Sequence, residues 1–223
     1  MVGAEPQQVP GRLERFRADY RSELTPNYNG WRHMLLNSAG VTGMGLLCLT
    51  GLDAPSAWHL LAIPSTLMAC NIAEFFFHKV PMHRPIAGLK AMFQRHVGVH
   101  HRYFTHERMS GSDAVDFHAT LTAPVQLLVV FLVAGLPMWL ATRFLLGPNE
   151  AALLGATAAG YTVVFEWLHL AWHARESHWV YRVPGMRALR RHHQLHHDPK
   201  RMNHEAFNIS FPLTDHLFGT TPE

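Results

Sequence analysis

The sequence predicts an all-α integral membrane protein: a four-helix bundle made of two transmembrane hairpins, with a cytoplasmic helical cap that is rich in histidine. Three observations lead to this prediction. Four apolar windows each contain about 20 residues, the length of helix that crosses a bilayer. All 19 Lys and Arg residues lie outside these windows. The chain of 223 residues holds 18 histidines, against 16 Asp and Glu residues, and most of the histidines lie in the polar segments.

The four windows are expected to be membrane-spanning helices in chain order. They comprise residues 34–52, 57–77, 119–142 and 151–172. Glu74 and Glu166 are the only carboxylates within them. Pro64, Pro124 and Pro137 lie inside the windows, where membrane helices tolerate proline better than soluble ones. Four such windows in a short chain make a bundle of buried soluble helices a poor alternative.

The positions of the basic residues predict the orientation. Residues 1–32 hold five of the 19 Lys and Arg residues, the loop 78–118 holds six, and the tail after His173 holds seven, whereas the link 53–56 holds none. Because basic loops stay on the cytoplasmic side, both termini and the loop are predicted to be cytoplasmic. Residues 78–118 and 173–223 would then form the cap of a single domain, 1–223. A preference for Arg over Lys favours a bacterial inner membrane, with the endoplasmic reticulum as the alternative.

Ten histidines fall into four closely spaced motifs on the predicted cytoplasmic side. These are HxxxxH (His78, His83), HxxxHH (His96, His100, His101), HxxxH (His169, His173) and HxxHH (His193, His196, His197). Neutral imidazole is the commonest protein ligand of transition metals. Ten ligands are too many for one metal ion, so the motifs predict two ions with about five ligands each. The alternative is a cap that is merely polar or pH-sensitive.

Helical spacing predicts which of these rings converge. Residues three or four apart share one face of an α-helix, so His96 is expected to converge with His100, and His169 with His173. The same holds within HxxHH. The five-residue spacing of His78 and His83 does not place them on one face, and Pro81 is expected to break the helix and return His83 from a turn. His192 lies four residues from His196, which leaves it open as a ligand in place of His193.

Two further features of the sequence carry hypotheses. Glu74 lies four residues before His78, and Glu166 three before His169, so each carboxylate could accept a hydrogen bond from a ligand imidazole. The alternative is a carboxylic acid kept neutral by desolvation. Segments 84–95 and 184–191 combine apolar and basic residues, so they either lie in the membrane plane or form solvated cap helices.

The four motifs in this order, each pair preceded by a helical hairpin, resemble the fatty acid hydroxylase/sterol desaturase superfamily. The tail is similar to the closing signature of that family, with Asn208, Asp215 and a Leu-Phe-Gly-Thr sequence that ends at Thr220. Ser210 stands where members often have glycine, and HxxxHH replaces the more common HxxHH. The resemblance covers about residues 58–220 and implies an integral membrane di-iron oxygenase whose ten motif histidines bind two Fe ions.

The resemblance also implies the reaction and its partners. We expect an O2-dependent hydroxylase of a lipid-like substrate, such as a fatty acyl chain or a sterol, with electrons from a separate ferredoxin or cytochrome b5 type protein. Zn could replace iron in purified protein. The alternatives are a desaturase or carotenoid-type ring hydroxylase on the same site, a metal transporter, and a non-catalytic di-zinc membrane protein. A transporter would hold its ligands near the bilayer midplane. No nucleic-acid partner is expected.

Overall fold

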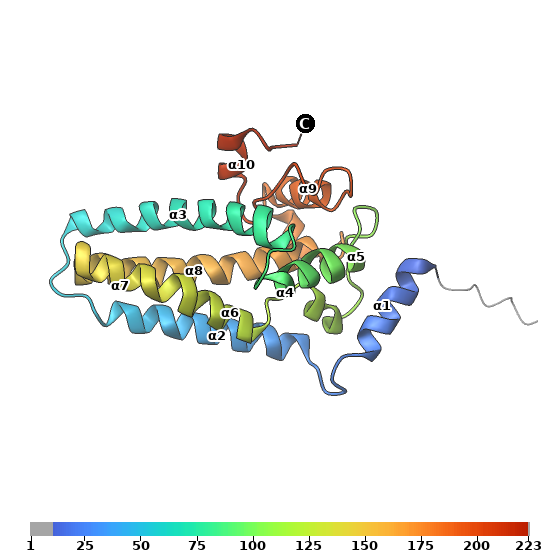
Figure 1. Cartoon of the computed structure of the whole chain (residues 1–223), viewed down its shortest axis with the longest axis horizontal. Helices are drawn as coiled ribbons and strands as arrows, with labels where there is room; N and C mark the ends of the chain where they lie inside the picture. Colours follow the sequence, from blue (N-terminus) through green and yellow to red (C-terminus); the bar gives the residue numbers. More distant parts are fainter. Residues whose placement is uncertain (1–10, 223) are drawn as a thin grey trace, which may run out of the picture.

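The long helices of the protein run side by side, and its shorter helices gather at one end of them (Figure 1). A computed structural model describes residues 11–222, and within this range the regular secondary structure is helical. The long elements are α2 (Gly30–Leu49), α3 (Ala62–Phe77), α6 (Pro124–Val130), which continues through η5 (Phe131–Gly135) into α7 (Leu136–Leu145), and α8 (Pro148–Trp172). Since α8 contacts α2, α3 and α7, it is the central helix of the bundle.

Three helical segments are long and apolar enough to cross a membrane. They are Ala57–Met82, Ala114–Leu145 and Pro148–Trp172, and they include three of the four predicted spans. The helix α2 does not meet this criterion, because Arg32, His33 and Asn37 lie in its first half and lower its mean hydropathy. It still exposes Leu35 and Leu47 on its outer surface, as the other long helices expose leucine, valine and phenylalanine. A fourth span at α2 therefore stays a prediction.

Small residues allow α2 and α8 to approach each other closely. A Cβ atom added to Gly45 would lie 2.9 Å from the Cβ of Ala159, and one added to Gly155 would lie 2.4 Å from the Sγ of Cys48. Close packing through small side chains is a common way for membrane helices to associate, because lipid supplies little hydrophobic driving force between them. The α2–α8 contact thus fixes the first hairpin against the last helix.

The start of α2 is where one added methyl group is expected to matter most. A Cβ on Gly30 would lie 2.0 Å from the backbone oxygen of Ala114, in η4 (Ala114–Ala119), and backbone cannot move aside as a side chain can. We expect Gly30→Ala to lower the free energy of unfolding by about 1–3 kcal/mol through overpacking. Thermal unfolding in detergent would measure this, with Gly43→Ala on the same helix as the control, since that site is open. Equal melting temperatures for the two variants would contradict the close contact.

The cap is built from short helices. In chain order these are α1 (Arg12–Ser22), η2 (His78–Met82), α4 (Lys90–Phe93), η3 (Gln94–His100), α5 (His101–Tyr103), η4, η6 (Trp179–Arg182), α9 (Met186–His196) and α10 (Leu213–Phe218). An ion pair fastens α1 to the rest of the cap, with Arg21 Nη2 2.7 Å from Asp116 Oδ1. Tyr103 donates a hydrogen bond to the same carboxylate. The cap therefore includes the chain before the first long helix.

The structure places the two segments considered for the membrane plane differently. Met186 and Leu189 of α9 pack against the buried cluster of Trp172, Tyr181 and Ile209. The apolar residues of segment 184–191 therefore contact the protein, which favours the cap-helix alternative over the interfacial one. In segment 84–95, the first α-helical residues are Lys90–Phe93, so its apolar residues do not share one helical stripe.

Candidate metal centre

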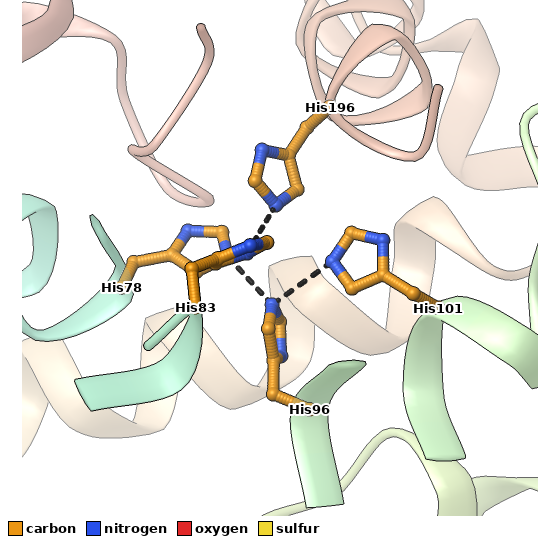
Figure 2. A group of neighbouring side chains, drawn as sticks. All are labelled: His78, His83, His96, His101 and His196. Carbon is orange, nitrogen blue, oxygen red and sulfur yellow. Dashed lines mark hydrogen bonds between the residues drawn. The ribbon is translucent and has the colours of Figure 1, made fainter. Parts of the chain in front are cut away.

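Nine of the ten motif histidines come together in two buried groups. The first group consists of His78, His83, His96, His101 and His196, and the second of His100, His169, His173 and His193. Within each group, one ring nitrogen from each residue lies within 4.8 Å of the others. Figure 2 shows that the five rings of the first group point toward one another from separate parts of the chain. The structure thus assembles two adjacent sets of nitrogen donors.

Two π-helical turns explain the pairing within the first group. His78 begins the π-turn η2, and His96 lies within the π-turn η3. In a π-turn the backbone hydrogen bonds join residues five apart, so the turn is wider than in an α-helix. His78 and His83 are five residues apart, with ring centroids 5.1 Å from each other. His96 and His101 have the same spacing, with centroids 4.7 Å apart. Residues at this spacing therefore meet within a single group.

These turns bear on two sequence predictions. Pro81 lies inside η2, but the helix ends one residue later at Met82 and His83 follows it in a turn, as expected. His96 and His100 do not converge on one site, because His96 belongs to the first group and His100 to the second. The prediction for His169 and His173 is confirmed in its geometry, since both lie in the second group. The α-helical period of 3.6 residues thus predicts the histidine pairing correctly on α8, but not in the wider π-turns.

The last motif is divided between the groups. His193 lies in the second group and His196 in the first, so the expected convergence of all three residues is wrong. His197 is assigned to neither group, but its Nε2 lies 3.0 Å from Nε2 of His193 and its ring stacks on His101 with centroids 4.4 Å apart. His192 turns away from both groups, and its Nε2 is 3.0 Å from Asp215 Oδ2. Its geometry therefore favours a structural role.

Backbone carbonyls orient half of the motif histidines. In five of them Nδ1 lies within hydrogen-bond distance of a carbonyl oxygen: His78 with Phe207 (2.5 Å), His100 with Ala119 (2.9 Å), His173 with Met109 (2.9 Å), His196 with Glu205 (3.1 Å) and His197 with Phe104 (2.6 Å). A carbonyl can only accept, so each Nδ1 carries the proton and each Nε2 presents a lone pair to the interior. This is the tautomer that binds a metal through Nε2.

The inward lone pairs need a positive charge between them. Nε2 of His193 lies 3.2 Å from that of His173 and 3.0 Å from that of His197, and both of the latter are unprotonated by the preceding argument. One proton on His193 Nε2 could satisfy only one of these neighbours. Burial holds the pKa of His173, His193 and His197 well below the usual value, and neighbouring imidazoles lower it further. Neutral nitrogens in this arrangement fit a metal ion.

The two carboxylates within the spans do not accept a hydrogen bond from a ligand imidazole, which corrects the hypothesis for Glu74 and Glu166. Glu74 accepts from the backbone of Ile209 and Ser210 and from two hydroxyl groups, those of Ser210 (2.5 Å) and Tyr161 (2.5 Å). Glu166 accepts from the hydroxyl of Thr122 (2.5 Å) and from its backbone N–H. Each glutamate therefore holds a chain segment, and the carbonyls of those segments hold the rings.

The segment held by Glu74 is also fixed by Asp215, a residue of the closing signature, and by Asn71, which the sequence did not single out. Asp215 accepts from the backbone N–H groups of Phe207 (2.9 Å) and Asn208 (2.8 Å). Asn71 of α3 accepts from Thr214 through backbone and hydroxyl, and donates to the carbonyl of Phe211 (2.8 Å). Asn71 could have been identified from the sequence, because it is a polar amide within an apolar span, three residues before Glu74. These bonds keep the carbonyl of Phe207 against His78.

Loss of the Asn71 amide is expected to loosen the C-terminal segment. Asn71→Leu would leave the buried backbone of Thr214 without its acceptor, at a cost of about 1–3 kcal/mol for each unpaired group. We expect a lower melting temperature and faster limited proteolysis after residue 206. Ser65→Ala on the same helix is the control, because the Ser65 hydroxyl donates to the carbonyl of Leu61, just before α3, and not to the C-terminal segment. Proteolysis of the Asn71 variant at the wild-type rate would contradict this anchoring.

A narrow crevice lies beside the second group, between α2, α6 and α8. Its lining residues are Asn37, Ser38, Val41, Leu127, Thr162, Val163 and Glu166. Glu166 is one of the lining residues and lies three residues before His169 on α8. The crevice is therefore close to the second group in sequence, but no histidine lines it.

The comparisons with known proteins point to one family. A model of the fatty acid hydroxylase family matches residues 63–220. Among solved structures, the hydroxylase domain visible in full-length Scs7p is similar in fold, with a TM-score of 0.62 and 16% sequence identity over 96% of this chain and 70% of that chain. None of the curated proteins matches the sequence.

Proposed function

The chain belongs to the fatty acid hydroxylase family, and from this premise we propose that it is an O2-dependent di-iron hydroxylase of a lipid-like substrate. The observation that carries the proposal is the pair of adjacent imidazole groups with their lone pairs directed inward. The first group would bind one iron ion, and the second group with His197 the other. When bound, the irons would supply the activation of O2 and the oxidation of an unactivated C–H bond.

The protein residues contribute orientation and exclusion of water. Carbonyls fix the rings of His78, His100 and His173 before a metal arrives, so little reorganisation is needed on binding. Phe104 stacks on His173 with ring centroids 4.0 Å apart, and it is buried, so it covers that side of the second group. We infer that a lipid-like substrate approaches from the apolar outer surface of the long helices.

The position of the groups bears on the alternatives. His78 directly follows α3, and His173 directly follows α8, so the groups lie at the ends of long helices. A transporter site would be expected near the bilayer midplane, which these positions do not favour. A desaturase or ring hydroxylase would use the same groups, and a zinc protein the same nitrogens. We keep the cytoplasmic orientation of both termini and the cap as part of the proposal.

Metal analysis is the test of this function. Protein purified without chelators or added zinc, from cells grown on iron-57, should contain about two irons per chain. Its Mössbauer spectrum should show an antiferromagnetically coupled pair, and lipid extracts of cells that express the gene should contain a hydroxylated product. Zinc alone, with no O2 consumption under any reductant, would overturn the proposal. An unsaturated product in place of an alcohol would assign the desaturase.

A further inference from the structure

An arginine-rich face of α9 lines a hollow on the outside of the cap. Arg187, Arg190, Arg191 and Gln194 follow the spacing i, i+3, i+4, i+7, so they share one face of this helix. Together with Glu176 and Tyr181 they line a hollow of about 260 Å³. Three guanidinium groups face one carboxylate there, so the hollow carries a net positive charge.

The arginines are not explained by the stability of α9. Positive charge near a helix N-terminus is unfavourable, and α9 has no acidic residue in its first turn and no side-chain cap on Gly185. Arg190 is held by Glu176 (3.3 Å) and the carbonyl of Trp172 (3.2 Å). Arg187 and Arg191 are exposed, and within residues 11–222 no ion pair or side-chain hydrogen bond holds either one. Two positive charges are thus free to meet an external anion.

Helix α9 lies between the hollow and the second histidine group. His193, which directly precedes Gln194, belongs to that group and projects from a different face of α9. The carbonyl bonded by Arg190 belongs to Trp172, the residue before His173. A partner seated in the hollow would therefore stand against the same helix that carries a proposed metal ligand.

We propose that this hollow docks the acidic surface of a small redox protein that supplies the electrons. This inference rests on the proposed function, in which R–H, O2, two electrons and two protons give R–OH and water. Two molecules of a one-electron carrier are then oxidised in each turnover. Complementary charge favours rapid, transient association of the kind such carriers need. A lipid surface is the poorer occupant, because Met186 and Leu189 turn the apolar side of α9 into the protein.

Binding and turnover of the iron-loaded full chain in phosphatidylcholine nanodiscs test the proposal. The probe is an acidic plant-type [2Fe–2S] ferredoxin, measured at low and high salt. We expect saturable binding that salt weakens, and Arg187→Gln/Arg191→Gln should weaken it by about tenfold at low salt. The matched control is Arg12→Gln/Arg15→Gln, which removes the same charge from an exposed part of α1 and should bind as the wild type does.

Each other outcome has a defined meaning. Equal weakening in both double variants, or no saturable binding of ferredoxin to the wild type, would overturn the docking site. Loss of binding to vesicles with anionic phosphatidylglycerol, with ferredoxin binding intact, would assign the arginines to lipid and overturn it as well. Reduced methyl viologen needs no docking site, so turnover with it tests the proposed function separately. Turnover with viologen in a chain that does not bind ferredoxin would overturn the docking site alone.

Discussion

His193→Ala should remove about half of the bound metal and lower turnover by at least about 100-fold. The fall exceeds the 10–100-fold typical of losing an outer hydrogen-bond partner, because a nitrogen donor itself is lost. His193 is fully buried, and its Nε2 lies close to those of His173 and His197, so alanine would leave a gap in this set of donors. Metal content by mass spectrometry, and the Mössbauer spectrum of the remaining iron, measure the effect.

The adjacent histidine provides the matched control. His192→Gln changes a residue of the same type one position away, but His192 contacts Asp215 and neither histidine group. It should keep both metal ions and most of the activity. If His192→Gln lost the metal and His193→Ala kept it, the last motif would be misassigned. Near-ultraviolet circular dichroism of both variants would show whether either change unfolds the chain.

The sequence was sufficient for the helices and for the set of histidines that meet. Apolar length alone located the segments that become α3, α6–α7 and α8, because a bilayer imposes a minimum helix length. Apolar length was less decisive for α2, because Arg32 and Asn37 make the first half of this helix polar while its outer face is apolar. Asn37 Nδ2 donates to the carbonyl of Thr122 (2.9 Å), a bond across the bundle that hydropathy cannot reveal.

The division of the histidines between the groups could not be predicted from spacing. A period of 3.6 residues pairs His96 with His100, whereas the π-turn places His96 with His101. Nothing in the local sequence specifies such a turn; it depends on the tertiary contacts of the cap. The carbonyl partners of the rings are hidden for a similar reason, since Phe207 meets His78 across more than a hundred residues of chain. These partners act through backbone carbonyls, which every residue has, so the residue type does not reveal them.

Glu74 shows how a carboxylate that does not touch the metal groups can still act on them. Its Oε1 accepts from the N–H groups of Ile209 and Ser210. These residues lie in the same buried stretch as Phe207, whose carbonyl oxygen accepts from His78. Its Oε2 accepts from the hydroxyl of Ser210, so the serine that departs from the family's glycine is tied to this carboxylate. We therefore propose that Glu74 positions Phe207, and through it His78.

Glu74→Leu should weaken metal binding by about 10–100-fold, the usual cost of losing an outer partner, and should also lower the melting temperature. Leucine leaves two backbone N–H groups unpaired, whereas Glu74→Gln retains one carbonyl oxygen for them and should lie between the leucine variant and the wild type. Competition with a chelator measures metal affinity, and Glu150→Leu, at the far end of α8, is the control for loss of a carboxylate. A Glu74→Leu protein that melts early but binds metal as tightly as the wild type would mean that Glu74 anchors the C-terminal segment without orienting His78. Weakened affinity in the leucine variant, with partial rescue by glutamine, is the result that requires the path through Phe207.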